Sequence, residues 1–194
     1  MPFPYHRFFF SPDLRVVSSS SVKYKPISGG QLLQHNHSHH SVAQLGLAWL
    51  RSNDCFRFNF RGISLGCDSV DAPCVFTVTA LNWDGVDDAV QGATTLEIPA
   101  CPAATDCELR RQILDPITAS TFTNLTAVNI TLSSPAQAQA WWADDIQISW
   151  ADTGCNAAAC RAKVPDRTMT NNSPKSFPGK PRRYMRWGSR QLHA

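Results

Sequence analysis

The sequence predicts an all-β protein: a jelly-roll-like antiparallel β-sandwich, braced by disulfides and followed by a disordered basic tail. Between residues 55 and 150, six segments alternate apolar and polar residues, with turn residues between them at a spacing of roughly ten residues. No long helical pattern interrupts them, and most of the cysteines form short-range couples. We therefore expect an irregular N-terminal segment with candidate edge strands (1–50), a sandwich core (51–160) and a tail (161–194).

The first two core strands are predicted to form a hairpin. Phe56, Phe58 and Phe60 alternate with polar residues, which indicates a half-buried strand. A polar turn and a second alternating strand follow. Cys67 and Cys74 flank this turn, so we expect a disulfide to staple the hairpin.

Four further strands are expected after an acidic turn at residues 84–88. Turns rich in Pro, Asp, Ser and Gly separate them, as in a sandwich. In the third of the four, the apolar residues face inward, so Asn129 is predicted to face solvent. The strands cover 94–98, 109–114, the second half of 122–132, and 146–150.

The cysteine spacing favours disulfides in an oxidising compartment. The expected pairs are Cys67/Cys74, Cys101/Cys107 and Cys155/Cys160. None of these is a CxxC pair, which argues against a zinc finger. Cys55 is left over; in an alternative pairing it bonds Cys155 or Cys160 and links the first core strand to the last.

Two sequons agree with an extracellular protein. Asn124 and Asn129 each begin an Asn-X-Thr triplet, so we expect both to be glycosylated. No apolar run approaches the roughly 18 residues that a membrane helix needs, so no membrane span is expected. The first residues do not resemble a signal peptide, and we expect a truncated N-terminus and a secreted or cell-wall location.

Charge is distributed unevenly along the chain. Residues 1–160 hold 9 Lys/Arg and 14 Asp/Glu, a net charge of −5, whereas residues 161–194 hold 9 Lys/Arg and one acid, a net charge of +8. A solvated, disordered extension accounts for such a composition. Attraction to nucleic acid, anionic lipid or acidic polysaccharide would also account for the charge. Nucleic-acid binding conflicts with secretion, so no nucleic-acid partner is expected.

Four histidines occur between residues 35 and 40, and such a cluster raises the question of a metal site. No helical pattern places two of them on one face. The sequence therefore favours a polar loop over a metal site.

The last predicted strand carries the candidate site residues. Ile146, Ile148 and Trp150 share one face of the strand, which predicts that they lie in the core. The same alternation directs Asp144 inward and Asp145 outward. A buried acid needs a partner, so Asp144 is predicted either to accept hydrogen bonds from loop amides or to bind a structural calcium ion.

Two tryptophans precede these acids. Adjacent residues of a strand face opposite sides, so one of Trp141 and Trp142 is expected to be exposed. An exposed indole beside Asp145 would suit a sugar, because sugars stack on flat aromatic rings while acids bind their hydroxyl groups. We therefore predict a ligand site at Trp141, Trp142 and Asp145.

The chain also resembles an uncharacterised domain family of fungal secreted and cell-surface proteins. Three groups of motifs carry the resemblance: Phe60 to Asp68 with Cys74, Phe122 to Thr126, and Trp141 to Ile146, with Pro4-Tyr5-His6 as a further piece. The family has no established activity, so the resemblance implies no catalytic residues. An aromatic residue followed by Asp-Asp-Ile is also distantly similar to jelly-roll carbohydrate-binding modules, which implies a structural calcium near Asp144.

These observations favour a non-catalytic extracellular domain that binds a cell-wall polysaccharide or another glycan, or that mediates adhesion. No catalytic motif or cofactor-binding motif is found. The alternative is a secreted glycoside hydrolase, for which two suitably spaced carboxylates are required. Candidates by residue type alone are Asp84, Asp87, Asp88, Asp144 and Asp145.

Overall fold

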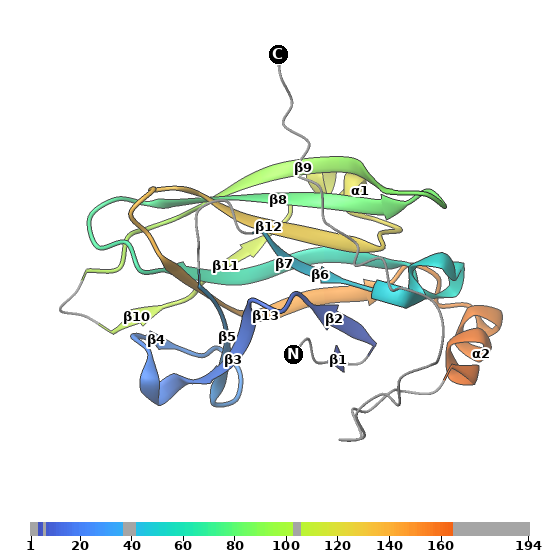
Figure 1. Cartoon of the computed structure of the whole chain (residues 1–194), viewed down its shortest axis with the longest axis horizontal. Coiled ribbons are helices and arrows are strands. Elements are labelled where there is room, and N and C mark those ends of the chain that lie inside the picture. Colours follow the sequence, from blue (N-terminus) through green and yellow to red (C-terminus); the bar gives the residue numbers. More distant parts are fainter. Residues whose placement is uncertain (1–3, 6, 37–41, 103–105, 165–194) are drawn as a thin grey trace, which may run out of the picture.

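Two large β-sheets face each other across a core of apolar side chains (Figure 1). The computed structural model describes residues 4–5, 7–36, 42–102 and 106–164. In spatial order, the first sheet consists of β1 (Pro4–Tyr5), β2 (Phe8–Phe10), β6 (Ala43–Gly46), β12 (Ala127–Ser134), β8 (Cys74–Trp83) and β9 (Asp88–Ile98). The second consists of β11 (Arg110–Ile113), β7 (Phe58–Cys67), β13 (Ala140–Trp150), β5 (Gln31–Asn36) and β3 (Leu14–Ser18).

All pairs within the two sheets are antiparallel, and the chain passes repeatedly from one sheet to the other, as in a jelly roll. The predicted antiparallel β-sandwich is therefore confirmed. A short parallel pair of β4 (Tyr24–Lys25) and β10 (Cys107–Glu108) lies outside the two sheets. The helical segments are short: η1 (Ser19–Ser21), η2 (Ala48–Ser52), η3 (Asp54–Phe56), α1 (Pro116–Thr121) and α2 (Cys155–Lys163).

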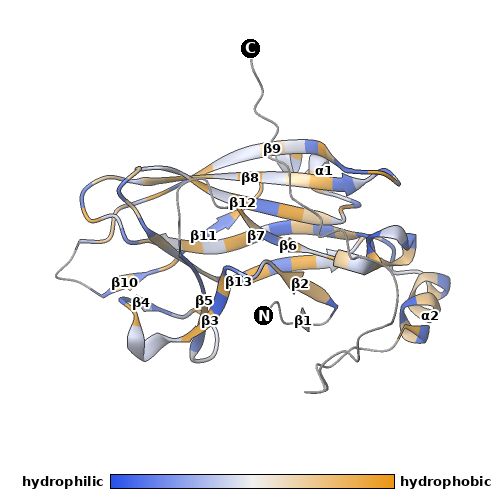
Figure 2. Cartoon of the chain, viewed as in Figure 1, coloured by the Kyte–Doolittle hydropathy of each residue, from blue (hydrophilic) through white to orange (hydrophobic). Residues whose placement is uncertain are grey.

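The core follows from the alternation of residues along the strands. Figure 2 shows hydrophobic and hydrophilic residues alternating along β12. Phe58 and Phe60 of β7 and Phe76 of β8 are fully buried between the sheets. Ile146, Ile148 and Trp150 of β13 pack against this core as predicted, although each remains partly exposed.

The first 50 residues are more regular than the sequence predicts. β5 lies between β13 and β3, and β6 lies between β2 and β12, so both are internal strands rather than edges. The difference arises because these strands are short and their residues do not alternate cleanly; their partners lie far away in the sequence. Most of the predicted histidine loop and nearly all of the predicted tail lie outside the described residues, and residues 161–163 belong to α2.

The predicted disulfides Cys67–Cys74 and Cys101–Cys107 are confirmed, but the pairing of Cys155 with Cys160 is wrong. Cys160 bonds Cys55, the alternative partner, and Cys155 is an exposed free thiol. The reason is that both residues lie in α2. Five residues of helix rise by about 7.5 Å, which exceeds the Cα separation of about 6.8 Å that a disulfide can span.

Candidate functional site

Neither Trp141 nor Trp142 forms the predicted ligand platform, because both are buried, with exposed fractions of 1% and 7%. Their side chains do lie on opposite faces of β13. Trp141 enters the main core, where it stacks on His35 and meets the edge of Phe76. Trp142 packs against Tyr24 of β4 in a second apolar cluster. The paired strands β4 and β10, with the residues around them, therefore cover the face that we expected to be open.

Asp144 is held by hydrogen bonds. Its Oδ2 accepts from the backbone amides of Ile27 and Ser28, both at 2.8 Å. Its Oδ1 accepts from the Ser28 hydroxyl at 3.1 Å and from the amide of Asp145 at 2.7 Å. These bonds supply the partners that a partly buried carboxylate needs. Within the described part of the chain, no group of three or more His, Cys, Asp or Glu residues is arranged to hold a metal ion.

Asp145 does not face solvent as a free acid. The register of β13 against β7 shifts between Asp144 and Gln147, so Asp145 lies in a β-bulge, with a φ of 48°. Its Oδ2 lies 3.4 Å from Nε of Arg111 and accepts a hydrogen bond from the side-chain Nε2 of Gln147 at 3.2 Å. The bulge adds one residue and breaks the alternation on which the prediction depended.

The two predicted glycosylation sites have different surroundings. Asn124 is exposed at a turn, and its backbone amide donates to Oδ1 of Asn59. Asn129 is half-buried in β12, and its Oδ1 accepts from Nε2 of Gln44 at 2.9 Å. Glycosylation at both residues stays a prediction.

A different part of the surface combines an exposed aromatic ring with polar side chains. We call it the Trp49 recess. Its volume is about 280 Å³, and it lies where η2 crosses the sheet formed by β6, β12, β8 and β9. Seven residues line it: Gln44, Ala48, Trp49, Arg51, Asp88, Thr126 and Ala127.

The local backbone presents Trp49 at the surface. Leu47 and Leu50 are buried and anchor η2, while Ala48 takes a φ of 45°, which is uncommon for a residue other than glycine. As a result the Trp49 side chain keeps an exposed fraction of 47%. A large aromatic ring at such exposure is a typical contact for a ligand.

Arg51 connects three elements of the recess. Its guanidinium lies 3.7 Å from the centroid of the Trp83 ring, at the end of β8. Its Nη1 donates to Oδ2 of Asp88 at 3.0 Å, at the start of β9. Cation–π stacking and a charge-assisted hydrogen bond together fix the orientation of the guanidinium.

Asp88 is the only carboxylate among the residues that line the recess. Burial raises its pKa above 3.8, and the nearby charges of Asp87 and Asp84 add to this effect, whereas Arg51 opposes it. Oδ1 of Asp88 is buried and has no hydrogen-bond partner among the described residues. A buried acceptor of this kind is costly unless it receives a donor.

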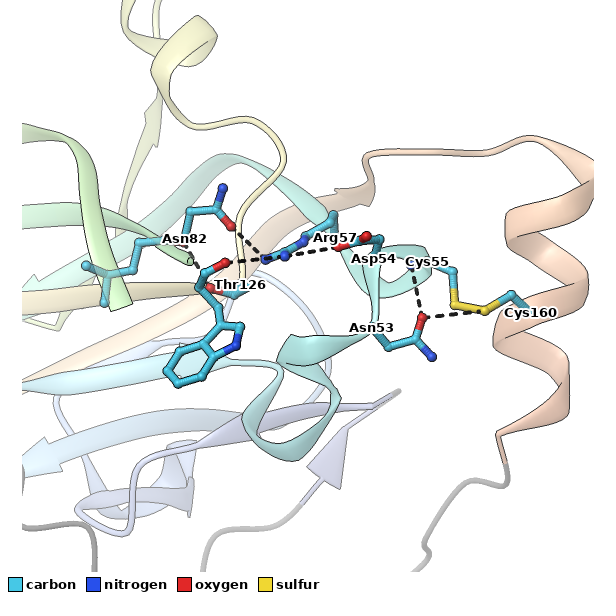
Figure 3. Close-up of polar contacts among 9 residues, drawn as sticks. Asn53, Asp54, Cys55, Arg57, Asn82, Thr126 and Cys160 are labelled. Carbon is cyan, nitrogen blue, oxygen red and sulfur yellow. Dashed lines mark hydrogen bonds and ion pairs between the residues drawn. A yellow bond between two sulfur atoms is a disulfide. The ribbon is translucent and has the colours of Figure 1, made fainter. Parts of the chain in front are cut away.

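A network of polar contacts around Arg57 holds η3 against β8 (Figure 3). Arg57 donates to Oδ1 of Asn82 at 2.6 Å and to Oδ1 of Asp54 at 3.1 Å. The Cys55–Cys160 disulfide ties η3 to α2, and Oδ1 of Asn53 accepts from the Cys55 amide. The segment that follows η2 is therefore fixed both to β8 and to α2.

The sequence pointed only in part to this recess. Asp88 was a candidate acid by residue type, but the sequence did not indicate Trp49, Arg51 or Gln44. The part of the chain that carries these residues forms β6 and η2. Trp49 lies in a five-residue 3₁₀ helix shortly after a four-residue strand, and neither element is long enough to show a clear periodic pattern.

Fold and disulfides together define a disulfide-braced β-sandwich domain. No helix of the described residues is long and apolar enough to cross a membrane. The chain matches the family model of a domain of unknown function, DUF7371, over residues 1–161, and it belongs to that family. A search of curated proteins found no match.

Proposed function

We propose that this domain is a non-catalytic, extracellular carbohydrate-binding module that takes a saccharide in the Trp49 recess. The exposed indole of Trp49 beside Arg51 and Asp88 carries this proposal. Sugars expose flat C–H faces, which stack on an aromatic ring, and hydroxyl groups, which need donors and acceptors around the ring. The recess offers both kinds of contact within one hollow.

The extracellular location draws support from the disulfides. Three disulfides in one domain are typical of oxidising compartments. An extracellular domain with a sugar-binding hollow would attach to a cell-wall polysaccharide or to the glycans of another surface protein.

Binding is favoured over hydrolysis. Glycoside hydrolases need two carboxyl groups about 5–5.5 Å apart for retention or about 6.5–9.5 Å apart for inversion. Asp88 is the only carboxylate among the residues that line the recess, and one of its oxygens already accepts from Arg51. Asp144 and Asp145 lie on β13 in the other sheet.

A glycan array that includes cell-wall polysaccharides tests this proposal. We expect the full chain to bind a subset of glycans, and the Trp49→Ala variant to bind none of that subset. Ile117→Ala is the control, because Ile117 is exposed on α1 and lies outside the recess. Equal binding by the Trp49→Ala variant would show that the recess is not the binding site. The release of reducing ends from a bound glycan would contradict a non-catalytic role.

A further inference from the structure

The second sheet divides at the bulge in β13. β5 pairs with β13 only across Ala140–Ala143, whereas β7 pairs with β13 as far as Trp150. From Asp145 onward, β13 therefore has a strand partner on one side only among the described residues. The space beside Ile146 and Ile148 is left open between the two sheets.

This space is a cleft of about 440 Å³, which we call the sheet cleft. Its volume falls within the range of small-molecule sites, about 300–1,000 Å³. Apolar residues from both sheets form most of its wall: Phe8, Phe10, Val16, Leu32, Leu33, Leu45, Ala143, Ile146 and Ile148. The polar residues that line it are Ser28, Gln31, Asp144 and Asp145.

The polar side of the cleft is fixed in place. Asp144 binds the backbone of Ile27 and Ser28, so the turn before β5 is clamped to β13. Asp145 adopts a φ of 48°, a backbone conformation that residues other than glycine seldom take. Such outliers concentrate where the position of a side chain matters for function.

The charges around the cleft favour a cation. Two carboxylates line it, and the guanidinium of Arg111 lies 3.4 Å from Asp145. The local balance of these three groups is thus one excess negative charge. An anionic head group would meet repulsion at this end, whereas an ammonium group would gain a charge-assisted hydrogen bond.

We propose that the sheet cleft binds a single-chain amphiphile with an ammonium head group. The alkyl chain lies between the sheets against Ile146 and Ile148, and the ammonium group donates to Asp145. This site is separate from the Trp49 recess and shares with it none of the lining residues. The presence or absence of amphiphile binding in the sheet cleft is therefore independent of saccharide binding in the Trp49 recess.

Calorimetric titration of the full chain with hexylammonium, octylammonium and octanoate tests the proposal. Each methylene buried in an apolar site raises affinity about fourfold, so octylammonium is expected to bind roughly 15-fold more tightly than hexylammonium. The opposite charge of octanoate is expected to weaken its binding on the order of tenfold relative to octylammonium. Equal affinities for octanoate and octylammonium would overturn the assignment of the head group.

Two variants with matched controls locate the binding. Val16→Trp fills the cleft and is expected to abolish octylammonium binding. Val70→Trp is the control and is expected to leave octylammonium binding unchanged. Both valines have an exposed fraction of 41%, but Val70 lies outside the cleft. Asp145→Asn is expected to remove the preference for octylammonium over octanoate while keeping the fold, because asparagine tolerates a positive φ. Unaltered octylammonium binding by Val16→Trp would overturn the proposal.

Discussion

The guanidinium of Arg51 lies over the ring of Trp83 and donates to the carboxylate of Asp88, so one side chain joins η2, β8 and β9. Both charged groups of this pair are largely buried. The guanidinium of Arg51 therefore helps to hold η2 against the ends of β8 and β9.

We expect Arg51→Ala to lower the free energy of unfolding by about 2 kcal/mol, because it leaves the Asp88 carboxylate buried and unpaired. It should also weaken saccharide binding, since the recess loses one wall. Arg15→Ala is the control, because Arg15 is exposed on β3. Urea unfolding of the three proteins measures the difference; an Arg51→Ala variant as stable as Arg15→Ala would show that the pair contributes nothing.

The second prediction concerns pH. Burial raises the pKa of Asp88 above 3.8, so the folded protein holds this proton more tightly than the unfolded chain does. Stability that depends on this group is present at low pH and is lost as the pH rises through the folded pKa. Relative to wild type, Asp88→Asn should therefore be more stable at about pH 7 than at about pH 3. A relative stability that changes in the opposite direction would mean that Arg51 outweighs burial.

The fold class could be predicted from the sequence because the alternation of apolar and polar residues along a strand is a local property. Phe58, Phe60 and Val128 each reveal an inward face from their own neighbours. The prediction failed for Trp142, because whether a face is covered depends on β4 and β10, which lie far away in the sequence. The prediction for Asp145 also failed, because no local sequence pattern indicates the bulge.

The cysteines show the same limit. The pairs Cys67–Cys74 and Cys101–Cys107 were predicted correctly, because in each pair the two cysteines close a short loop. The pairing of Cys160 depended on whether residues 155–163 form a helix, and their composition gave no clear helical periodicity. The candidate recess was missed for a related reason, because η2 brings Trp49 and Arg51 to residues from β8 and β9 that are distant in sequence.

The third prediction concerns the long-range disulfide. Cys55 and Cys160 are 105 residues apart, so their bond restricts the unfolded chain strongly. The double variant Cys55→Ala/Cys160→Ala is expected to lose roughly 3–5 kcal/mol of stability, whereas Cys155→Ala should lose little. Thermal unfolding measures both, and thiol titration of the unfolded wild-type protein should find one reactive thiol. Two extra thiols, or a large loss with Cys155→Ala, would contradict the pairing.

The fourth prediction concerns Asp144. Removal of its carboxylate leaves the amides of Ile27 and Ser28 without their acceptor. Asp144→Ala is expected to cost about 1.5–3 kcal/mol, and the exposed Asp71 supplies the control Asp71→Ala. Because hydrogen bonds already engage both oxygens, the melting temperature of the wild-type protein should not respond to calcium or to a chelator. A rise with calcium that disappears in Asp144→Ala would restore the calcium hypothesis.

The central claim is that Trp49 is the platform of a saccharide site. The measurement that tests it most directly is a calorimetric titration of wild type, Trp49→Ala and Ile117→Ala with one oligosaccharide that the array identifies. We expect Trp49→Ala to bind at least about tenfold more weakly, which corresponds to about 1.4 kcal/mol, with an unchanged melting temperature. Ile117→Ala should bind as wild type does. Equal affinities for all three proteins would contradict the account.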